Sequence, residues 1–471
     1  RYVRVRGYAG GGVPTDSVWY IDAVGVRTGR AALQRTQELE TRARALSELL
    51  ESATAGLPQQ YAGQAAGARE RLQAVFKTIR GLEDTAVEEL PAAVQGLGQE
   101  LDILDAAVLR LSAVQHFAPF NDGRAPDYIA SWAPSMVKLR PESPLRASDL
   151  AFEGTMALAR HEYEALQLVV MGGDIALEDV AVTMSPLTHA ESGEVLAPEH
   201  VQVEKVRFVK VNNELWPDPI VPVNTFDLAA GAQQALWVRV YAPEDAPAGT
   251  YACVATIAPK NAHPVELPLS VRVFDFTLPV QAHTKHVISC GGGGLDAVLF
   301  DHRGGTGGGP CTGSIAEPRY ILRADGSMAM DFTEYDKVMA RAFEMGLTAF
   351  GLPMSGGDGS GLLASRLRRT FHDEAKGADV DVSMNPFDGP EAKARMLGWL
   401  RLFCAHLKEK GWFERAFFYL WDEPSPSYSE QLVGVGRVVR EAVPDLKIMC
   451  VSFDPLESWH EVVDIYCPPV Q

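Results

Sequence analysis

Residues 416–424 read AFFYLWDEP, and this stretch decides the fold of the C-terminal part of the chain. Its first six residues are apolar or aromatic and are flanked by polar segments, which predicts a strand covered on both faces, as in a parallel sheet. Asp422 and Glu423 then lie at the C-terminal end of that strand. In (β/α) barrels the connecting loops converge at this end, so the reactive residues gather there.

The acid pair also has a simpler interpretation. Asp422 would cap the helix that follows, and Glu423 would be a solvated acid in its first turn, because acids are favoured at helix starts. Successive strand side chains point to opposite faces, so both acids reach one pocket only where the strand end is bulged or twisted. Pro424 is expected to hold Glu423 in extended geometry.

The segments on either side of the pair favour the strand. Residues 390–410 carry a helical apolar stripe, residues 428–442 predict a second helix, and residues 446–453 predict a second buried strand. Helices and strands in alternation indicate a parallel α/β fold.

Several stretches of the chain resemble one enzyme family. Residues 408–424 (KEKGWFERAFFYLWDEP), with 443–448 (VPDLKI) and 463–466 (VDIY), resemble the catalytic domain of glycoside hydrolase family 123. Residues 160–167 (RHEYEALQ), the loop at Asp218-Pro219, and residues 237–240 and 249–251 resemble the N-terminal β-sandwich of that family. Together the resemblance spans about residues 135 to 471.

The resemblance implies an activity. Family 123 enzymes are β-N-acetylgalactosaminidases with an Asp-Glu pair at a barrel strand end, so the expected partner is a glycan substrate with N-acetylhexosamine. It also implies a secreted or periplasmic bacterial protein. In the substrate-assisted mechanism, the 2-acetamido oxygen of the sugar is the nucleophile. Glu423 would protonate the leaving oxygen and later activate water, while Asp422 would accept the acetamide N–H.

The residues themselves leave alternatives open. Ordinary retaining glycosidases need two carboxylates ~5–5.5 Å apart, usually on different strands, which adjacent acids do not obviously provide. A general acid that works near neutral pH needs a raised pKa, which an apolar wall and a neighbouring carboxylate supply. Trp421 and Tyr419 are candidate substrate-binding walls and, equally, candidates for plain core. A non-catalytic carbohydrate-binding or structural protein on a vestigial scaffold, or a glycosidase for another sugar, are the other hypotheses.

The whole chain is predicted to be multidomain. An antiparallel β-sandwich at 135–281 precedes a (β/α)8-type barrel at 282–471, because the hydrophobic period is two in the first region and alternates between helix and strand in the second. Residues 29–117 predict a helical coiled-coil segment or bundle, and residues 1–28 the tail of a carbohydrate-binding-type jelly roll. A helical segment of this kind is also a candidate for self-association.

The predicted barrel is C-terminally incomplete. Six strands are expected, at 286–289, 347–353, 380–384, 416–423, 446–453 and 463–468, whereas a closed barrel needs eight. The glycine-rich residues 291–309 lack a GK[ST] sequence, so a loop over the active-site rim is expected rather than a phosphate cradle.

Composition excludes several functions. The net charge of −18 argues against nucleic acid and anionic membrane as partners, and no apolar run approaches the ~20 residues that span a bilayer. The six cysteines show no zinc signature, and pairing of Cys290 with Cys311 stays open. His283 and His286 do not have a recognisable ligand spacing, so neither a metal nor a cofactor is expected.

Overall fold

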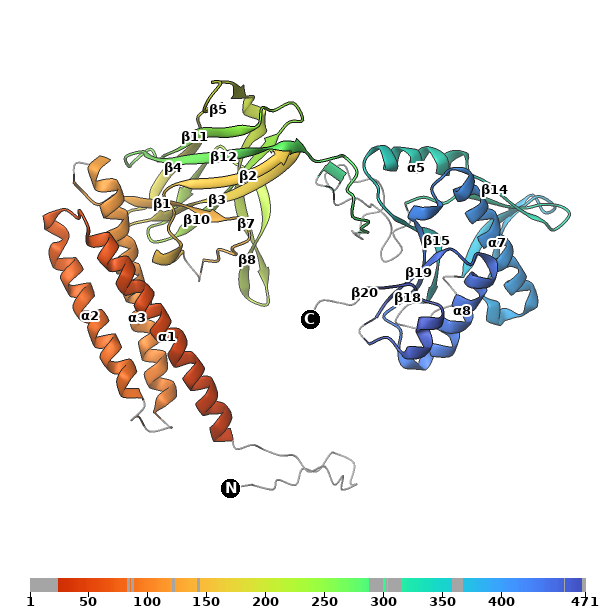
Figure 1. Cartoon of the computed structure of the whole chain (residues 1–471), viewed down its shortest axis with the longest axis horizontal. Coiled ribbons are helices and arrows are strands. Elements are labelled where there is room, and N and C mark those ends of the chain that lie inside the picture. Colours follow the sequence, from red (N-terminus) through yellow and green to blue (C-terminus); the bar gives the residue numbers. More distant parts are fainter. Residues whose placement is uncertain are drawn as a thin grey trace. The chain divides into compact units, whose positions relative to one another are not determined.

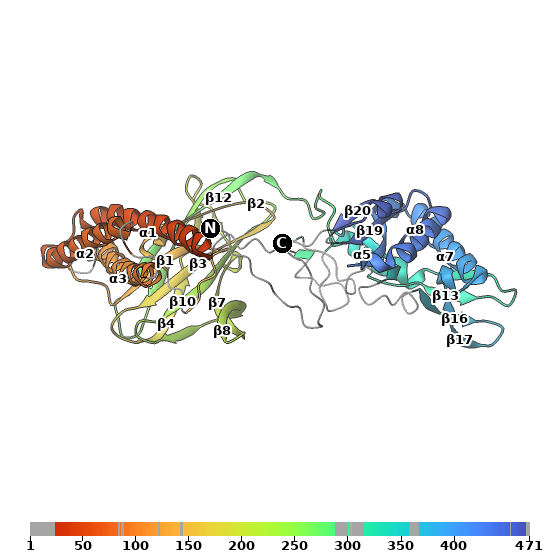
Figure 2. The same ribbon diagram turned by 90° about the horizontal axis from the view of Figure 1, so that it is seen from below.

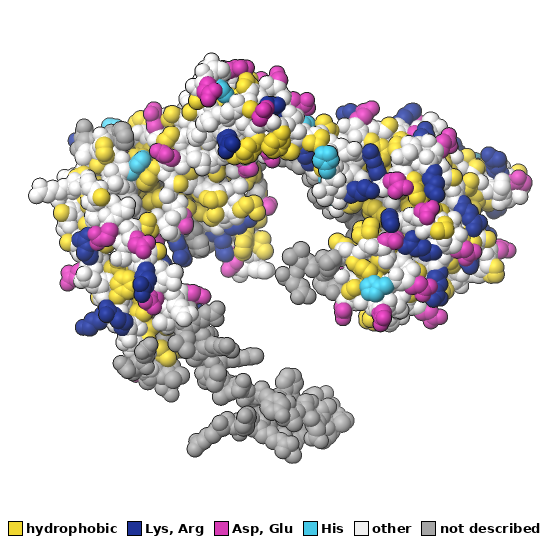
Figure 3. All heavy atoms as spheres, viewed as in Figure 1, with side chains coloured by type: hydrophobic (Ala, Val, Ile, Leu, Met, Phe, Trp, Pro, Cys, Tyr) yellow, Lys and Arg dark blue, Asp and Glu magenta, His cyan; other side chains and the backbone are white. Residues whose placement is uncertain are grey.

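The structure is a computed structural model of the 471-residue chain, and it describes residues 24–82, 85, 89–120, 123–141, 145–287, 300–301, 303, 315–357, 367–452 and 454–467. The chain forms two compact units, Arg1–Thr277 and Leu278–Gln471. Figures 1 and 2 show a helical bundle and a β-sandwich in the first unit and a mixture of helices and strands in the second. Acidic and basic side chains are interspersed over the visible face of each unit (Figure 3).

Three helices lie side by side in the N-terminal unit (Figure 1): α1 (Val24–Thr54), α2 (Ala62–Gly81) and α3 (Leu90–Phe117). The leucines that repeat along the sequence fill one buried core, so their spacing serves a three-helix bundle. The first helix begins at Val24 rather than at residue 29, so residues 24–28 of the predicted jelly-roll tail (1–28) are helical instead. Residues 1–23 of that tail lie outside the described residues. Coiled-coil geometry and self-association remain predictions.

The β-sandwich has two sheets. The first has the order β1-β3-β10-β7-β8 and is antiparallel throughout; its strands are β1 (Tyr128–Pro134), β3 (Glu162–Gly172), β10 (Gln233–Ala242), β7 (Val201–Val211) and β8 (Glu214–Pro222). The second has the order β2-β12-β11-β4-β9, with β5 and β6 beside β11; its strands are β2 (Gly154–Arg160), β12 (Val265–Thr277), β11 (Gly249–Ala258), β4 (Leu177–Met184), β9 (Thr225–Leu228), β5 (Leu187–His189) and β6 (Val195–Leu196). The pairing of β2 with β12 is parallel, which the prediction of an antiparallel sandwich missed.

The bundle and the sandwich share packing. Ala113 and Phe117, near the end of α3, belong to the hydrophobic core between the two sheets. The backbone N–H of Ala147, after β1, donates to the buried carboxylate of Asp105 in α3 at 3.3 Å. These contacts explain why the two regions, predicted as separate domains, form one compact unit.

The C-terminal unit is built on a parallel four-stranded sheet. Its order is β15-β18-β19-β20, from β15 (Phe350–Gly357), β18 (Ala416–Asp422), β19 (Lys447–Val451) and β20 (Ile465–Cys467). Helices α5 (Thr333–Glu344), α7 (Pro390–Glu409) and α8 (Ser429–Ala442) alternate with these strands and contribute to one large hydrophobic core with them. This is half of a (β/α) barrel, and the described residues do not close it.

A second sheet in this unit corrects one predicted barrel strand. The segment expected at 380–384 is β17 (Ala378–Ser383), which pairs antiparallel with β16 (Arg368–Asp373) in a sheet of order β14-β13-β16-β17. The other two strands are β13 (Arg319–Leu322) and β14 (Met328–Asp331). The alternating DVDVS pattern at 379–383 belongs to a strand with one solvated face, not to a barrel strand buried on both. Of the strand expected at 286–289, residues 288–289 lie outside the described part, and His286 and Val287 are not in a strand.

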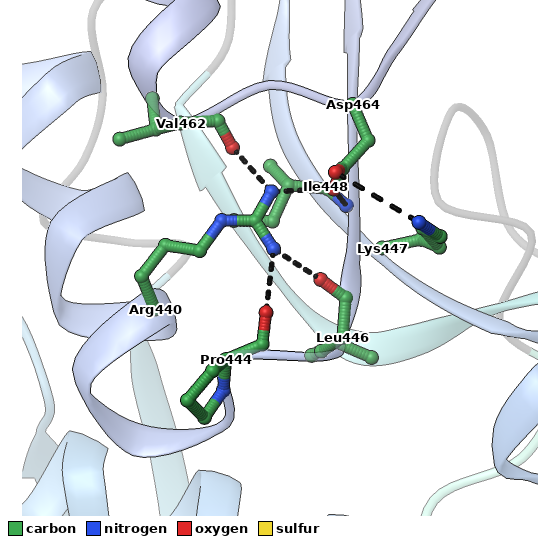
Figure 4. A network of polar contacts seen from close by, with 7 residues as sticks. All are labelled: Arg440, Pro444, Leu446, Lys447, Ile448, Val462 and Asp464. Atoms are coloured by element: carbon green, nitrogen blue, oxygen red, sulfur yellow. Dashed lines mark hydrogen bonds and ion pairs between the residues drawn. The ribbon is translucent and has the colours of Figure 1, made fainter.

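Arg440 in α8 makes hydrogen bonds to the segments that precede β19 and β20 (Figure 4). Its guanidinium donates to the carbonyls of Pro444 at 3.0 Å, Leu446 at 2.8 Å and Val462 at 2.9 Å, and it pairs with Asp464. Asp464 in turn accepts the N–H of Ile448 at 2.8 Å. This network lies at the opposite end of the sheet from Asp422. In (β/α) folds, residues at that end contribute to stability rather than to catalysis.

Candidate active site

A bulge in β18 sets the direction of its last side chains. Tyr419 pairs with Met449 and Trp421 pairs with Cys450, so two residue steps on β18 are matched by one step on β19. Up to the bulge, Phe417 and Tyr419 share one face with Met449 and Val451, while Phe418 and Leu420 face the helix-packed core. The extra residue reverses the alternation beyond it.

As a result, Asp422 lies on the same face as Tyr419. The Tyr419 hydroxyl donates to Oδ1 of Asp422 at 2.8 Å. Asp422 pairs with Val451 in the ladder, and its side chain is half-buried. Because α5, α7 and α8 pack on the other face, this face corresponds to the inside of a barrel. The alternation of strand side chains predicted that the acids could share a pocket only at a bulged or twisted strand end. For Asp422, the bulge in β18 meets this requirement.

Glu423 does not have the extended geometry expected before Pro424. Its φ is 48°, in the left-handed region, while its N–H still donates to the carbonyl of Val451 at 3.0 Å. The ladder thus continues one residue beyond the strand, and the chain then turns sharply toward η8 (Pro426–Tyr428). A non-glycine residue in this region costs on the order of 1–3 kcal/mol, and such strain is concentrated at functional sites. The Glu423 side chain is exposed.

Trp421 lies on the helix-packed face and is 0% exposed. Its ring stacks on Tyr428 with centroids 5.7 Å apart. The bulge turns the ring of Trp421 away from Asp422 and into the core. Trp421 therefore packs behind the strand and does not form the substrate-binding wall that was expected. Tyr419 is also buried, but its hydroxyl reaches the acid, so it orients Asp422 rather than offering an open aromatic surface.

Cys450 lies beside the pair on β19. Burial and, to a lesser extent, the nearby Asp422 carboxylate together raise the pKa of its thiol to about 12. A thiol with such a pKa stays protonated near neutral pH, and the thiolate is the nucleophilic form. Cys450 is therefore a core residue, and Asp422 and Glu423 remain the candidate reactive groups at this strand end.

No metal site accompanies the acids in the part of the chain that the structure describes, where three or more His, Cys, Asp or Glu side chains nowhere gather as ligands. Cys290, Cys311 and most of the glycine-rich residues 291–309 lie outside that part. None of the described helices combines the length and the apolar character that crossing a bilayer requires.

Comparison with protein families identifies the class of this unit. Residues 283–468 match the model described as glycoside hydrolase 123, catalytic domain, and this range contains Asp422 and Glu423. By sequence, residues 283–468 are thus similar to a glycoside hydrolase catalytic domain, that of family 123.

Comparison with solved structures gives low similarities. A family 123 glycoside hydrolase from Clostridium perfringens, described in work on glycolipid glycan hydrolysis, is 13% identical with a TM-score of 0.49, and the match covers 72% of this chain and 66% of that one. A Bacteroides ovatus GH5 xyloglucanase is 8% identical with a TM-score of 0.17, covering 67% of this chain and 68% of that one. A search of curated proteins gave no match.

Proposed function

We propose that the chain is a glycoside hydrolase that removes terminal β-linked N-acetylhexosamine, N-acetylgalactosamine in particular, with retention of configuration. The observation that carries this proposal is the bulge in β18, which turns Asp422 to the inner face of the sheet beside Tyr419. An aspartate that only capped the next helix would not need this arrangement. The match of residues 283–468 to family 123 supports the same class of reaction.

The proposed mechanism uses the acetamide of the substrate as the nucleophile. Its carbonyl oxygen attacks the anomeric carbon as the glycosidic bond breaks, and Glu423 gives its proton to the leaving oxygen. The cyclic oxazolinium intermediate then reacts with a water molecule whose proton returns to Glu423. Two inversions at the anomeric carbon leave its configuration unchanged.

Asp422 has the positioning role in this proposal. Its Oδ1 is held by the Tyr419 hydroxyl, which fixes the plane of the carboxylate. Oδ2 is the acceptor proposed for the acetamide N–H, and a hydrogen bond to an ionised acceptor is roughly twice as strong as a neutral one. Orienting the acetamide toward the anomeric carbon is worth a large part of the barrier, because an intramolecular nucleophile must approach in the right geometry.

Two other functions compete with this proposal. A glycosidase for another sugar would use the same scaffold with a protein nucleophile on another strand, since fold does not fix substrate. A non-catalytic binding protein would retain the acids without turnover.

A comparison of aryl substrates separates the three functions. Aryl β-N-acetylgalactosaminide, β-N-acetylglucosaminide and β-galactoside are assayed with the parent chain and with Glu423→Gln. Turnover of the acetamido sugars alone, inhibited by a thiazoline analogue of the intermediate, is expected. Equal turnover of the 2-hydroxy sugar would rule out the assisted mechanism, and no turnover of any substrate would favour the binding protein.

A further inference from the structure

A pocket of about 540 Å³ lies where the helical bundle meets the β-sandwich in the first compact unit. Its lining comes from the C-terminal end of α3, from the segment that leads into β1, and from the hairpin of β11 and β12. A volume of this size is typical of small-molecule sites, which form preferentially where structural parts meet. None of the lining residues belongs to the candidate active site.

Part of the lining is apolar and already ordered. Phe117 and Tyr128 are at most 5% exposed and belong to the core of the sandwich. The Tyr128 hydroxyl donates to the carbonyl of Ile257 at 2.8 Å, so it is engaged within the fold. Three proline rings line the same pocket, those of Pro126, Pro264 and Pro268. A ligand that binds against these rings orders few flexible side chains, which lowers the entropic cost of binding.

His116 in α3 adds a hydrogen-bonding group to this apolar lining. Its ring stacks on Phe152, with centroids 4.1 Å apart, and meets the ring of Phe117 edge-on at 4.7 Å. Among the described residues the imidazole makes no hydrogen bond. Burial lowers the pKa of His116, although the charge of Glu153 opposes this effect, so the ring is neutral near pH 7. A neutral imidazole offers one donor and one acceptor to a ligand.

Two exposed acids, Asp127 and Glu266, also line the pocket. Within the part of the chain that the structure describes, neither carboxylate makes a hydrogen bond or an ion pair. Glu266 has a fixed place on β12, where it pairs with Thr256 of β11. Ionised carboxylates only accept hydrogen bonds, so they favour a ligand that offers several donors. Arg124 and His263 are further polar residues of the lining, which therefore carries charges of both signs.

This lining favours an uncharged ligand with both apolar and hydroxyl groups. Two carboxylates disfavour an anion, and a purely apolar ligand would leave His116, Asp127 and Glu266 partly desolvated without partners. A metal ion is not expected either, because His, Cys, Asp and Glu side chains of the described residues form no group of three that could hold one. A pyranose ring fits both parts of the lining, since its C–H faces are apolar and its hydroxyls donate as well as accept.

We infer that this pocket binds one uncharged sugar residue of a glycan, as a second carbohydrate site on the bundle and sandwich. The sugar ring lies against the apolar part of the lining, and its hydroxyls donate to Asp127 and Glu266 and form a hydrogen bond with His116. The choice of a glycan as the ligand rests on the proposed function. The site itself is independent of the acid pair and retains a glycan chain without cleaving it.

Binding is tested with the full chain carrying Glu423→Gln, which slows turnover. The probe is a neutral trisaccharide that ends in N-acetylgalactosamine, and the readout is the imidazole resonances of His116 in histidine-labelled protein. These resonances are assigned as the ones that His116→Phe removes. A saturable shift of the His116 resonances is expected during the titration. Resonances that do not respond to the trisaccharide would overturn the inference, as would a response to a polyamine in its place.

A pair of acid substitutions locates the binding. Glu266→Ala should weaken the affinity measured at His116 about 10-fold, as for loss of a hydrogen bond to a charged group. Glu178→Ala is the matched control, because it removes an exposed acid from β4 of the same sheet, outside the pocket. Its affinity should equal that of the parent. Equal weakening by the two substitutions would mean a general effect of charge and would contradict the proposed site.

His116→Phe separates ligand binding from packing. The new ring can still stack on Phe152, so the thermal melt should be unchanged, while both ring nitrogens are lost. Calorimetry with the trisaccharide should then show one binding event fewer than in the parent chain. An unchanged number of events in a variant that melts as the parent does would overturn the inference.

Hydrolysis of aryl substrates distinguishes this inference from the proposed function. His116→Phe in the chain with intact Glu423 should hydrolyse them as the parent does, because the pocket contains no residue of the acid pair. A parent chain that hydrolyses no aryl substrate counts against the proposed function alone. Absence of a response at His116 counts against the second carbohydrate site alone.

Discussion

The hydroxyl of Tyr419 donates to the carboxylate of Asp422 three residues further along the same strand, at 2.8 Å. In a regular strand, residues three apart point to opposite faces and do not meet. The bulge between Tyr419 and Trp421 removes this obstacle. The bulge therefore places Asp422 on the same face as Tyr419, and the tyrosine hydroxyl then orients the Asp422 carboxylate.

Tyr419→Phe should lower kcat on an acetamido substrate about 10- to 100-fold, because Asp422 loses the hydrogen bond that orients it. The ring is retained, so the fold should be unaffected. Steady-state kinetics together with a thermal melt test this expectation. A variant that melts as the parent does but shows unchanged kcat would mean that Asp422 needs no orientation by Tyr419.

Glu423→Gln should lose general acid catalysis, typically ~10²–10⁴-fold, on a natural glycan. An aryl glycoside with a very good leaving group needs little protonation, so formation of its intermediate should suffer less. Asp422→Asn should impair both substrates, because the acetamide must be oriented whatever the leaving group. Burst kinetics on the two substrates distinguish these patterns, and equal losses for Glu423→Gln on both would argue against a role as acid.

The sequence was sufficient for the regular elements around the site. The apolar run at 416–421 was predicted to be a buried strand and lies in β18, and the helical stripe at 390–410 corresponds to α7 at Pro390–Glu409. Both patterns depend on local spacing, which a single sequence contains. The strand at 380–384 was predicted in the wrong sheet, although its alternating aspartates were a signal for a solvated face.

The backbone conformation at Asp422 and Glu423 could not be predicted from the sequence alone. The bulge depends on how β18 pairs with β19, and the φ of 48° at Glu423 depends on the continued bond to Val451. Neither the register nor the turn is encoded in AFFYLWDEP alone, and Pro424 pointed to the opposite conformation. For the same reason Trp421 looked like a candidate wall, although the register places it in the core.

Arg440→Ala should destabilise the C-terminal unit by about 2–4 kcal/mol, because it leaves several carbonyls and Asp464 without their donor. Arg437→Ala on the same helix is the matched control. Arg437 pairs with Glu461 at 2.6 Å, but both side chains are more than half exposed, so the pair should contribute little to stability. Chemical denaturation of both variants tests the difference, and equal destabilisation would show that the network at Arg440 has no special role.

Asp105 in α3 should make the stability of the N-terminal unit depend on pH. Burial raises the pKa of this carboxyl above its ordinary value, and this outweighs the hydrogen bond from Ala147 and the charges of Arg42 and Arg146, which lower it. A raised folded-state pKa means that folding favours the protonated form. The associated stability is present below the ordinary pKa of about 4 and is lost as pH rises through the folded-state value.

Asp105→Asn should therefore stabilise the N-terminal unit at pH 7. The amide oxygen still accepts the N–H of Ala147, while the cost of burying a charge is removed. The gain should shrink as pH falls toward about 4, because the parent side chain then becomes neutral as well. Denaturant unfolding of the two proteins between pH 7 and pH 4 measures this difference. An asparagine variant that is less stable than the parent at pH 7 would show that the ionised form is bound favourably, through Arg42 and Arg146, and that burial is not the dominant effect.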